Sequence, residues 1–330
     1  MAHSQESNTG NAGRTVLVLG ATGGIGGAVA RKLHERGYKV RAMHRNAREQ
    51  ALKTPEYDWV AGDAMVAADV LDAAAGAALI VHAVNPPGYR NWQTLVLPMI
   101  DNTIAAAEAT GATILMPGTI YNYAPEDFAG ISEESPQRSP TRKGRIRVAL
   151  EEHLKAAAGR GTRVLIVRAG DFFGPGAGNN WFAQAVVKPG KPVKAITNPA
   201  APGVGHQWAY LPDVAETMVQ LFERADDLPD FARFHMEGFW DHDGLQLAAA
   251  IRRVTGKPDL PVKGFPWWMV KLAAPFNETF REIMEMSYLW REPLHLRNEQ
   301  LVAFLGAEPH TPIDTAVEET LAGLGCLENR

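Results

Sequence analysis

The sequence has little of what marks several large classes of protein. It holds one cysteine among 330 residues, Cys326, so it can form neither an internal disulfide framework nor a cluster of thiolate metal ligands. Its net charge is −4, which argues against a nucleic acid or an anionic membrane as partner. No apolar run approaches the length of a bilayer span. We therefore expect a cytoplasmic globular protein without nucleic-acid or membrane partners.

Two signatures of hydrolytic and metal-dependent catalysis are also missing. The sequence contains no Gly-x-Ser-x-Gly nucleophile elbow and no two histidines four residues apart. Its histidines are isolated, so we expect no metal site. His206 is expected to be structural or exposed, with a position in a substrate cleft as the alternative.

What is present is an alternation of short apolar segments with longer helical patterns. The expected strands are 15–19, 39–44, 58–61, 78–83, 112–116 and 162–168, and the expected helices are 25–36, 92–110 and 145–158. This alternation predicts right-handed βαβ crossovers, and hence an α/β fold with a Rossmann-type doubly wound parallel sheet. Apolar strands without polar alternation are typical of a sheet covered by helices on both faces.

The segment LVLGATGGIG, residues 17–26, joins the first expected strand to the first expected helix. Its glycines Gly20, Gly23 and Gly26 are three residues apart. The first permits a tight turn, the second a close approach of backbone to a pyrophosphate, and the third close packing of helix on strand. The helix N-terminus adds amide donors and a positive dipole end. The segment therefore predicts a site for a dinucleotide.

The wording GATGGIG resembles the short-chain dehydrogenase/reductase superfamily, in particular its extended or atypical branch, often described as NAD-dependent epimerases/dehydratases. The turns GD at 62–63 and HAVN at 82–85, and the segments VRAGDFFGP at 167–175 and WAYLPDV at 208–214, are similar to further motifs of that branch. The resemblance implies contacts to the phosphates, the adenine, and the ribose and nicotinamide. The cofactor-binding residues expected on this basis are Gly20, Thr22, Gly23, Gly24, Ile25, Arg45, Asp63, Ala64, Ala83, Val84 and Asn85.

The end of the second strand indicates which dinucleotide is bound. A carboxylate there would bind the ribose 2′-hydroxyl of NAD, whereas an arginine suits the 2′-phosphate of NADP. The sequence has Arg45 at this point and no acid before Glu49. A planar guanidinium matches a phosphate dianion, so we favour NADP(H) over NAD(H). The alternative is that Arg45 is an ordinary solvent-exposed arginine.

The composition changes near residue 175, after which prolines are frequent and loops are expected. This change indicates the domain organisation. We expect a disordered tail (1–13), an NAD(P)-binding Rossmann domain (14–175) and a smaller, mostly helical substrate-binding cap (176–330), part of which returns to the sheet. A helix is expected to begin near Thr311-Pro312. The cluster 267–269 (WWM) is expected in the core, with an apolar substrate face or dimer face as the alternative.

The catalytic residues that the resemblance implies are only partly present. Family oxidoreductases use a Ser or Thr after the fifth strand and a Tyr-x-x-x-Lys pair on the next helix. Matching Tyr123-Ala124 to the family's Tyr-Gly places Thr119 at the hydroxyl position. The Tyr-x-x-x-Lys pair is absent, since the chain has no tyrosine between Tyr123 and Tyr210.

Two alignments show what stands in place of that pair. Aligned on Ser-Pro at 139–140, Thr141 and Arg145 replace the tyrosine and the lysine. Aligned on the glutamate of the following helix, Lys143 and Arg147 replace them. In both alignments the phenol is lost, and the basic partner is an arginine, which cannot shuttle a proton.

Three explanations stay open. Tyr121 or Tyr123 supplies the acid, with Lys143 or Arg147 beside it. Alternatively, Lys143 is the acid/base, with its pKa lowered by burial or by the neighbouring arginines. In the third, no proton is transferred.

The sequence thus favours an NADP(H)-dependent oxidoreductase or epimerase/dehydratase-like enzyme that acts on a small carbonyl or hydroxyl compound. The alternative is a non-catalytic NADP(H)-binding redox sensor or scaffold. Beyond the small-molecule substrate, a second copy of the chain in a homodimer is the partner to consider.

Overall fold

The computed structural model describes residues 13–86, 91–128, 130–178 and 180–327, so the expected N-terminal tail lies almost wholly outside the described residues. Its main feature is a parallel seven-stranded sheet in the order β10-β6-β5-β4-β1-β2-β3. The strands of this sheet are β1 (Thr15–Leu19), β2 (Lys39–His44), β3 (Asp58–Ala61), β4 (Ala77–His82), β5 (Thr113–Gly118), β6 (Val164–Arg168) and β10 (Phe231–His235).

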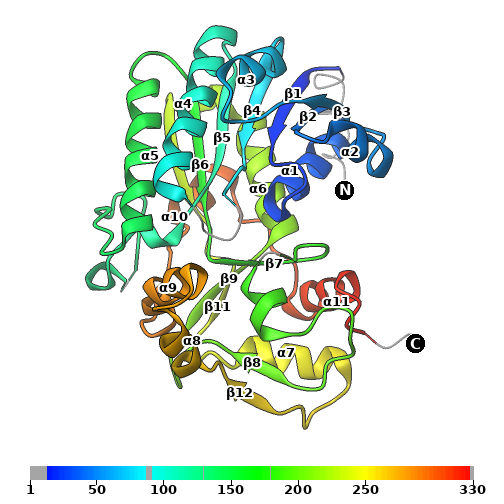
Figure 1. The fold of residues 1–330 in the computed structure, drawn as a ribbon, viewed down its shortest axis with the longest axis vertical. Coiled ribbons are helices and arrows are strands. Elements are labelled where there is room, and N and C mark those ends of the chain that lie inside the picture. The colour runs from blue at the N-terminus through cyan, green and yellow to red at the C-terminus, as the bar shows by residue number, and fades with distance from the viewer. Residues whose placement is uncertain (1–12, 87–90, 129, 179, 328–330) are drawn as a thin grey trace.

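Helices cover both faces of this sheet (Figure 1). Along β1, Val16 and Val18 pack with α1 and α6 on one face, while Leu17 and Leu19 pack with α3 and α4 on the other. This explains why the strand has no polar alternation. The helices of this part are α1 (Gly24–Glu35), α2 (Ala47–Lys53), α3 (Ala67–Ala74), α4 (Trp92–Thr110), α5 (Arg142–Ala158) and α6 (Leu211–Glu223).

The strand order reverses direction between β1 and β4. The chain runs from β1 through β2 to β3 on one side, then crosses to β4, β5 and β6 on the other. In such sheets the crevice at the carboxyl ends, at the point of reversal, is the usual ligand site. The predicted doubly wound sheet is confirmed, and a strand from the second half of the chain, β10, pairs with β6 at its edge.

Helix α5 begins three residues earlier than predicted, at Arg142 instead of Arg145. Thr141 caps it, since its Oγ1 accepts a hydrogen bond of 3.0 Å from the Gly144 amide. Gly144 also permits a close approach, because a Cβ there would lie 2.1 Å from the Tyr121 carbonyl oxygen. The first turn of α5 is thereby pressed against the loop that follows β5.

The remainder of the chain forms a smaller body below the sheet in Figure 1. It holds a three-stranded sheet in the order β11-β9-β7 and a parallel pair β12-β8. Its strands are β7 (Asp171–Phe173), β8 (Ile196–Asn198), β9 (His206–Tyr210), β11 (Phe239–Asp241) and β12 (Val262–Gly264). Its helices are α7 (Gln246–Thr255), α8 (Trp267–Ala273), α9 (Glu278–Glu285) and α11 (Ile313–Gly323). Helix α10 (Glu299–Leu305) instead packs on β10 at the edge of the seven-stranded sheet, where Phe304 contacts Phe234 (Figure 1).

The expectation that the cluster 267–269 lies in the core is wrong for two of its members. Trp268 is 67% exposed and Met269 is 52% exposed, whereas Trp267 packs against Trp181 with ring centroids 5.8 Å apart. The reason is that α8 buries only one side, and both residues lie on the other. Whether this apolar side meets a second copy of the chain stays a prediction. No helix in the described part of the chain is both long and apolar enough to cross a bilayer.

Candidate functional site

The glycine turn after β1 has the geometry of a phosphate cradle. Gly20 has a φ of +92°, and a Cβ there would lie 2.5 Å from the Ala83 carbonyl oxygen. A Cβ at Gly26 would lie 2.2 Å from the Gly20 carbonyl oxygen, so α1 approaches the turn more closely than any other residue type permits. Gly23 begins α1 without a side-chain cap, and Thr22 and Gly23 are exposed. The first-turn amides are therefore open to an anionic ligand, as a dinucleotide pyrophosphate requires.

The segment after β4 lies across from this turn. The Ala83 amide donates to the Leu19 carbonyl oxygen at 3.0 Å, which ties the segment to the end of β1. Ala83 and Val84 are half-buried, and Asn85 is exposed. These residues lie beside the glycine turn, where the sequence predicts the ribose and the nicotinamide.

The residues predicted to bind the adenine side of the cofactor follow β2 and β3. Arg45 is exposed directly after β2. Glu49, the first acid after it, forms an ion pair of 2.6 Å with Lys53 on α2. Asp63 is half-buried, and its Oδ1 accepts from the Met65 amide at 3.0 Å, while Ala64 beside it is buried.

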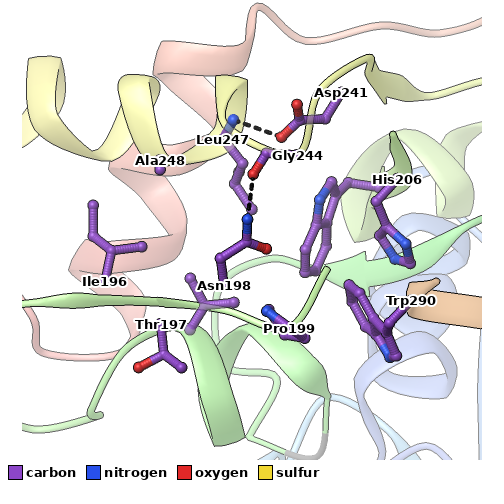
Figure 2. Close-up of a pocket in the computed structure, with 12 residues that line it drawn as sticks. Ile196, Thr197, Asn198, Pro199, His206, Asp241, Gly244, Leu247, Ala248 and Trp290 are labelled. Atoms are coloured by element: carbon purple, nitrogen blue, oxygen red, sulfur yellow. Dashed lines mark hydrogen bonds between the residues drawn. The ribbon is translucent and has the colours of Figure 1, made fainter. Parts of the chain in front are cut away.

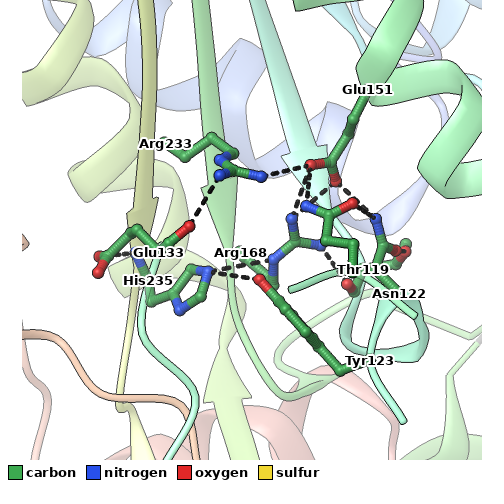
Figure 3. A network of polar contacts seen from close by, with 9 residues as sticks. Thr119, Asn122, Tyr123, Glu133, Glu151, Arg168, Arg233 and His235 are labelled. Atoms are coloured by element: carbon green, nitrogen blue, oxygen red, sulfur yellow. Dashed lines mark hydrogen bonds and ion pairs between the residues drawn. The ribbon is translucent and has the colours of Figure 1, made fainter. Parts of the chain in front are cut away.

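After β5, Thr119 belongs to a hydrogen-bond network in which the donor and the acceptor of each bond can be assigned (Figure 3). The Asn122 amide nitrogen donates to Glu151 Oε1 at 2.8 Å and to Gln137 Oε1 at 2.9 Å. The amide oxygen of Asn122 therefore faces Thr119, whose hydroxyl donates to it at 2.6 Å. With its proton used in this way, Thr119 offers only lone pairs to a ligand, and acts as a hydrogen-bond acceptor.

Glu151 is the centre of that network, and it is 4% exposed. Both of its carboxylate oxygens accept from Arg168, at 2.7 and 2.9 Å, and Arg233 lies 3.6 Å away. Arg168 is fully buried and also donates to the Thr119 carbonyl oxygen. Burial works against its charge, but Glu151 raises the pKa of Arg168 above its usual value. This pair joins α5, β5 and β6 behind the site.

Tyr123 belongs to the same buried network. Its side chain is fully buried, and its hydroxyl lies 3.2 Å from His235 Nε2, which also accepts from Arg168 Nε at 3.3 Å (Figure 3). Burial raises the pKa of the Tyr123 phenol and lowers that of His235 well below its ordinary value. Of the two tyrosines considered from the sequence, Tyr123 is enclosed in the protein.

Tyr121 lies differently, in the short 3₁₀ turn Ile120–Asn122, and it is partly exposed. Its ring packs against Trp92, with centroids 6.2 Å apart. Burial raises the pKa of the Tyr121 phenol, and the Arg147 guanidinium partly offsets that rise. The phenol, the Thr119 hydroxyl and the Arg147 guanidinium are thus neighbours.

Arg147 completes this group from α5. It is 7% exposed, its Nη2 donates to Asn85 Oδ1 at 3.0 Å, and its guanidinium carbon lies 4.9 Å from the centre of the Trp92 ring. Behind it, His82 is fully enclosed and contacts Thr103 at 2.8 Å. Burial, assisted by the Arg147 charge, lowers the pKa of His82 to about 3, so this histidine is neutral.

Lys143 lies one turn before Arg147, over the same Trp92 ring at 5.6 Å. It is 1% exposed, and its Nζ forms an ion pair of 2.7 Å with Glu282 on α9. Burial lowers the pKa of Lys143, while Glu282 acts in the opposite direction. Arg145, the alternative in the other alignment, is exposed and donates to the Pro140 carbonyl oxygen at 3.0 Å.

The lone histidine His206 lies in the smaller body beside a narrow pocket (Figure 2). It is 4% exposed, its Nε2 is 2.8 Å from Asp171, and its ring stacks on Trp290 with centroids 3.7 Å apart. Asn198 and Asp241, also at this pocket, bind backbone groups of 244–247. His206 is accordingly packed in the interior.

Sequence reasoning missed the buried network. Asn122, Glu151 and His235 were not among the site residues, and Arg168 appeared only as part of a motif. The signal that could have found them is weak. A glutamate in the middle of an expected helix and an arginine ending an apolar strand are each ordinary until the fold brings them together.

Comparison with known proteins fits this geometry. Residues 20–177 match a family model described as NAD(P)H-binding. A sequence comparison with curated proteins finds no match. Three solved structures show the likeness of fold. A UDP-N-acetylglucosamine 4-epimerase from Bacillus cereus is 17% identical, with a TM-score of 0.71, over 96% of this chain and 98% of the other.

The second is a nucleoside-diphosphate-sugar epimerase from Pseudomonas aeruginosa, 17% identical, with a TM-score of 0.69 over 94% of this chain and 97% of the other. The third is the enzyme WbmH of Bordetella bronchiseptica in complex with NAD+, 17% identical, with a TM-score of 0.67 over 94% and 98%. Residues 20–177 therefore form an NAD(P)H-binding domain. Over most of its length the chain has the fold of these three solved structures.

Proposed function

We propose that this chain is an NADP(H)-dependent oxidoreductase or epimerase/dehydratase-like enzyme acting on a small hydroxyl or carbonyl compound, with Tyr121 as its proton donor and acceptor. The observation that carries the proposal is the proximity of the Tyr121 phenol to Thr119 and to Arg147, whose guanidinium binds Asn85 after β4. A phenol, a hydroxyl and a cation are the groups that proton transfer beside a nicotinamide requires.

Each of these side chains has a distinct role. A bound nicotinamide would supply or accept the hydride. Tyr121, whose pKa is raised by burial, is protonated at neutral pH and would donate its proton to the carbonyl oxygen that becomes a hydroxyl. Thr119 would accept a hydrogen bond from that hydroxyl. Because the phenol holds its proton at neutral pH, it is in the form that carbonyl reduction needs.

The other two acid/base candidates are less suited. Tyr123 is fully buried against His235, and Lys143 is enclosed by its ion pair with Glu282. For either to reach a substrate, a buried contact would have to open. The partly exposed Tyr121 needs no such change.

The preference for NADP(H) rests on Arg45. It is exposed beside the adenine position, and the nearest following acid, Glu49, is engaged by Lys53. A guanidinium without a competing carboxylate suits a 2′-phosphate. WbmH was solved with NAD+, so the preference has to be measured for this chain.

One observation favours the alternative, a non-catalytic NADP(H)-binding redox sensor or scaffold. Lys143, which takes the position of the family's tyrosine in one of the two alignments, forms an ion pair with Glu282 in the second half of the chain. If cofactor binding broke this ion pair, the surface formed by α8 and α9 would change although no reaction is catalysed. A partner protein could sense that change.

Two measurements test the proposal. Fluorescence titration should give a Kd for NADPH at least tenfold below that for NADH, with Arg45→Ala removing the difference and the neighbouring Arg48→Ala keeping it. NADPH oxidation across a panel of carbonyl compounds should then identify turnover that Tyr121→Phe lowers by about 100-fold or more. The matched variant Tyr123→Phe should keep most of it. NADPH binding without turnover on any compound would favour the sensor, and equal affinities for NADPH and NADH would refute the role of Arg45.

A further inference from the structure

Arg147 carries a buried positive charge that has no acidic partner among the described residues. Its side chain is 7% exposed, and its Nε is buried without a hydrogen-bond acceptor. Its hydrogen bond to Asn85 goes to a neutral amide oxygen. No carboxylate oxygen in the described ranges lies within 4.0 Å of the guanidinium. An arginine cannot escape this situation by losing its proton.

The cations around Arg147 are, by contrast, paired. Lys143 on the same helix has Glu282, and Arg168 and Arg233 share Glu151. In the described part of the chain, Arg147 is therefore the one of these four cations that has no carboxylate within ion-pair distance. A single charge matches a monoanion, and the fork of a guanidinium binds both oxygens of a carboxylate.

The position of Arg147 says which part of a ligand it would meet. It is a neighbour of Tyr121, which we propose to handle the reacting oxygen, and it bonds to Asn85 at the end of β4. An anion bound here would therefore lie beside the group that the proposed function assigns to the reacting oxygen. Thr119, which offers lone pairs only, suits a hydroxyl at that carbon.

We propose that the Arg147 guanidinium binds the carboxylate of the substrate, which is a small 2-oxo or 2-hydroxy acid. This proposal rests on the proposed function, since it takes Tyr121 as the group at the reacting oxygen. It differs from the activities of the two epimerases among the structural neighbours, because it assigns the chain a small organic acid in place of a nucleotide-linked sugar.

Calorimetric titration of the full chain with four probes tests this site. These are 2-oxobutanoate, oxamate, inorganic phosphate and the neutral ketone 2-butanone, each with and without saturating NADPH. We expect the two carboxylates to bind at least tenfold more tightly than either 2-butanone or phosphate. Arg147→Gln should lower that affinity at least tenfold, and Arg147→Lys should lower it less. Arg145→Gln, an exposed arginine two residues earlier on α5, should leave it within twofold.

Several outcomes would overturn the proposal. They are equal binding of acid and ketone, tighter binding of phosphate, or an unchanged affinity for 2-oxobutanoate in Arg147→Gln. Loss of NADPH affinity alone in that variant would assign the guanidinium to the cofactor, and would also overturn it. Far-UV circular dichroism of each variant checks that it is folded. If the wild type binds 2-oxobutanoate but not NADPH, the proposed function fails and the carboxylate site stands.

Discussion

Two buried arginines, Arg168 at the end of β6 and Arg147 on α5, differ in their surroundings. Arg168 has both oxygens of Glu151, the Thr119 carbonyl and His235 around it. Arg147 has one amide oxygen, the Tyr121 phenol and the face of Trp92. A buried charge with a complete set of partners holds a structure together, whereas one that lacks an acid is prepared for a ligand. By this difference we assign Arg168 a structural role and Arg147 a role in ligand binding.

The largest effect should follow from removing the acid of the complete pair. Glu151→Gln leaves Arg168 and Arg233 without their carboxylate in the interior, and we expect a loss of about 3–5 kcal/mol in the free energy of unfolding. Arg147→Met, which removes the charge that has no acid, should change it by no more than about 1 kcal/mol. Urea unfolding of both variants measures this. Similar losses in the two would remove the distinction between the arginines.

Each arginine also has a buried histidine beside it, and both histidines should make the fold sensitive to acid. Burial lowers the pKa of His82 to about 3 and that of His235 well below its ordinary value. A folded-state pKa below the unfolded value gives stability that is present above pH 6.5 and lost as the pH falls. Between pH 6.5 and 4.5, His82 alone should cost roughly 2–3 kcal/mol.

Unfolding free energies of the wild type and His82→Gln at these two pH values test this prediction. The variant should lose less stability on acidification than the wild type does. A wild type whose stability stays constant, or rises, between pH 6.5 and 4.5 would contradict it.

Lys143 provides an intermediate case, because it is buried like the arginines but can lose its proton. Glu282→Gln removes its acid, and we expect a loss of about 1–3 kcal/mol, less than for Glu151→Gln. The loss should shrink as the pH rises from 7 toward 10, since the neutral amine needs no partner. Denaturant titrations across this range measure it. A loss independent of pH would show that the ion pair is not its cause.

The smallest effect concerns the cap that sets the start of α5, and with it the positions of Lys143 and Arg147. Thr141→Ala should lower the free energy of unfolding by about 1 kcal/mol, because the Gly144 amide loses its acceptor. Thr141→Ser keeps the hydroxyl and should restore most of the stability. Thermal unfolding of the two variants is sufficient, and equal melting temperatures would contradict the role of the cap.

The parts of the molecule that follow from the sequence are those fixed by local pattern. The strand before Gly20, the glycine turn and α1 are specified by neighbouring residues, and they are found where predicted. The start of α5 was placed three residues late, since the apolar pattern is weak there and the Thr141 cap was not recognised. That error left Lys143 outside the expected helix, although one of the two alignments pairs it with Arg147.

The charged residues of the site were harder to predict because their partners come from distant segments. In the sequence, Glu151 is one more acid on a helix beside a run of arginines. In the fold it contacts Arg168 from β6 and Arg233 from β10. The spacing of these residues along the chain does not predict the contacts. Likewise, nothing local distinguishes the exposed Arg145 from the buried Arg147. Partial exposure, which separates Tyr121 from Tyr123, is also a property of the folded chain alone.

A crystal structure with NADP+ and 2-hydroxybutanoate tests the contrast between the two arginines most directly. We predict carboxylate oxygens within hydrogen-bond distance of Arg147, the hydroxyl of the acid near Thr119 and Tyr121, and an unchanged Arg168–Glu151 pair. A carboxylate bound elsewhere, with the Arg147 guanidinium held by the ribose of the cofactor, would contradict this assignment.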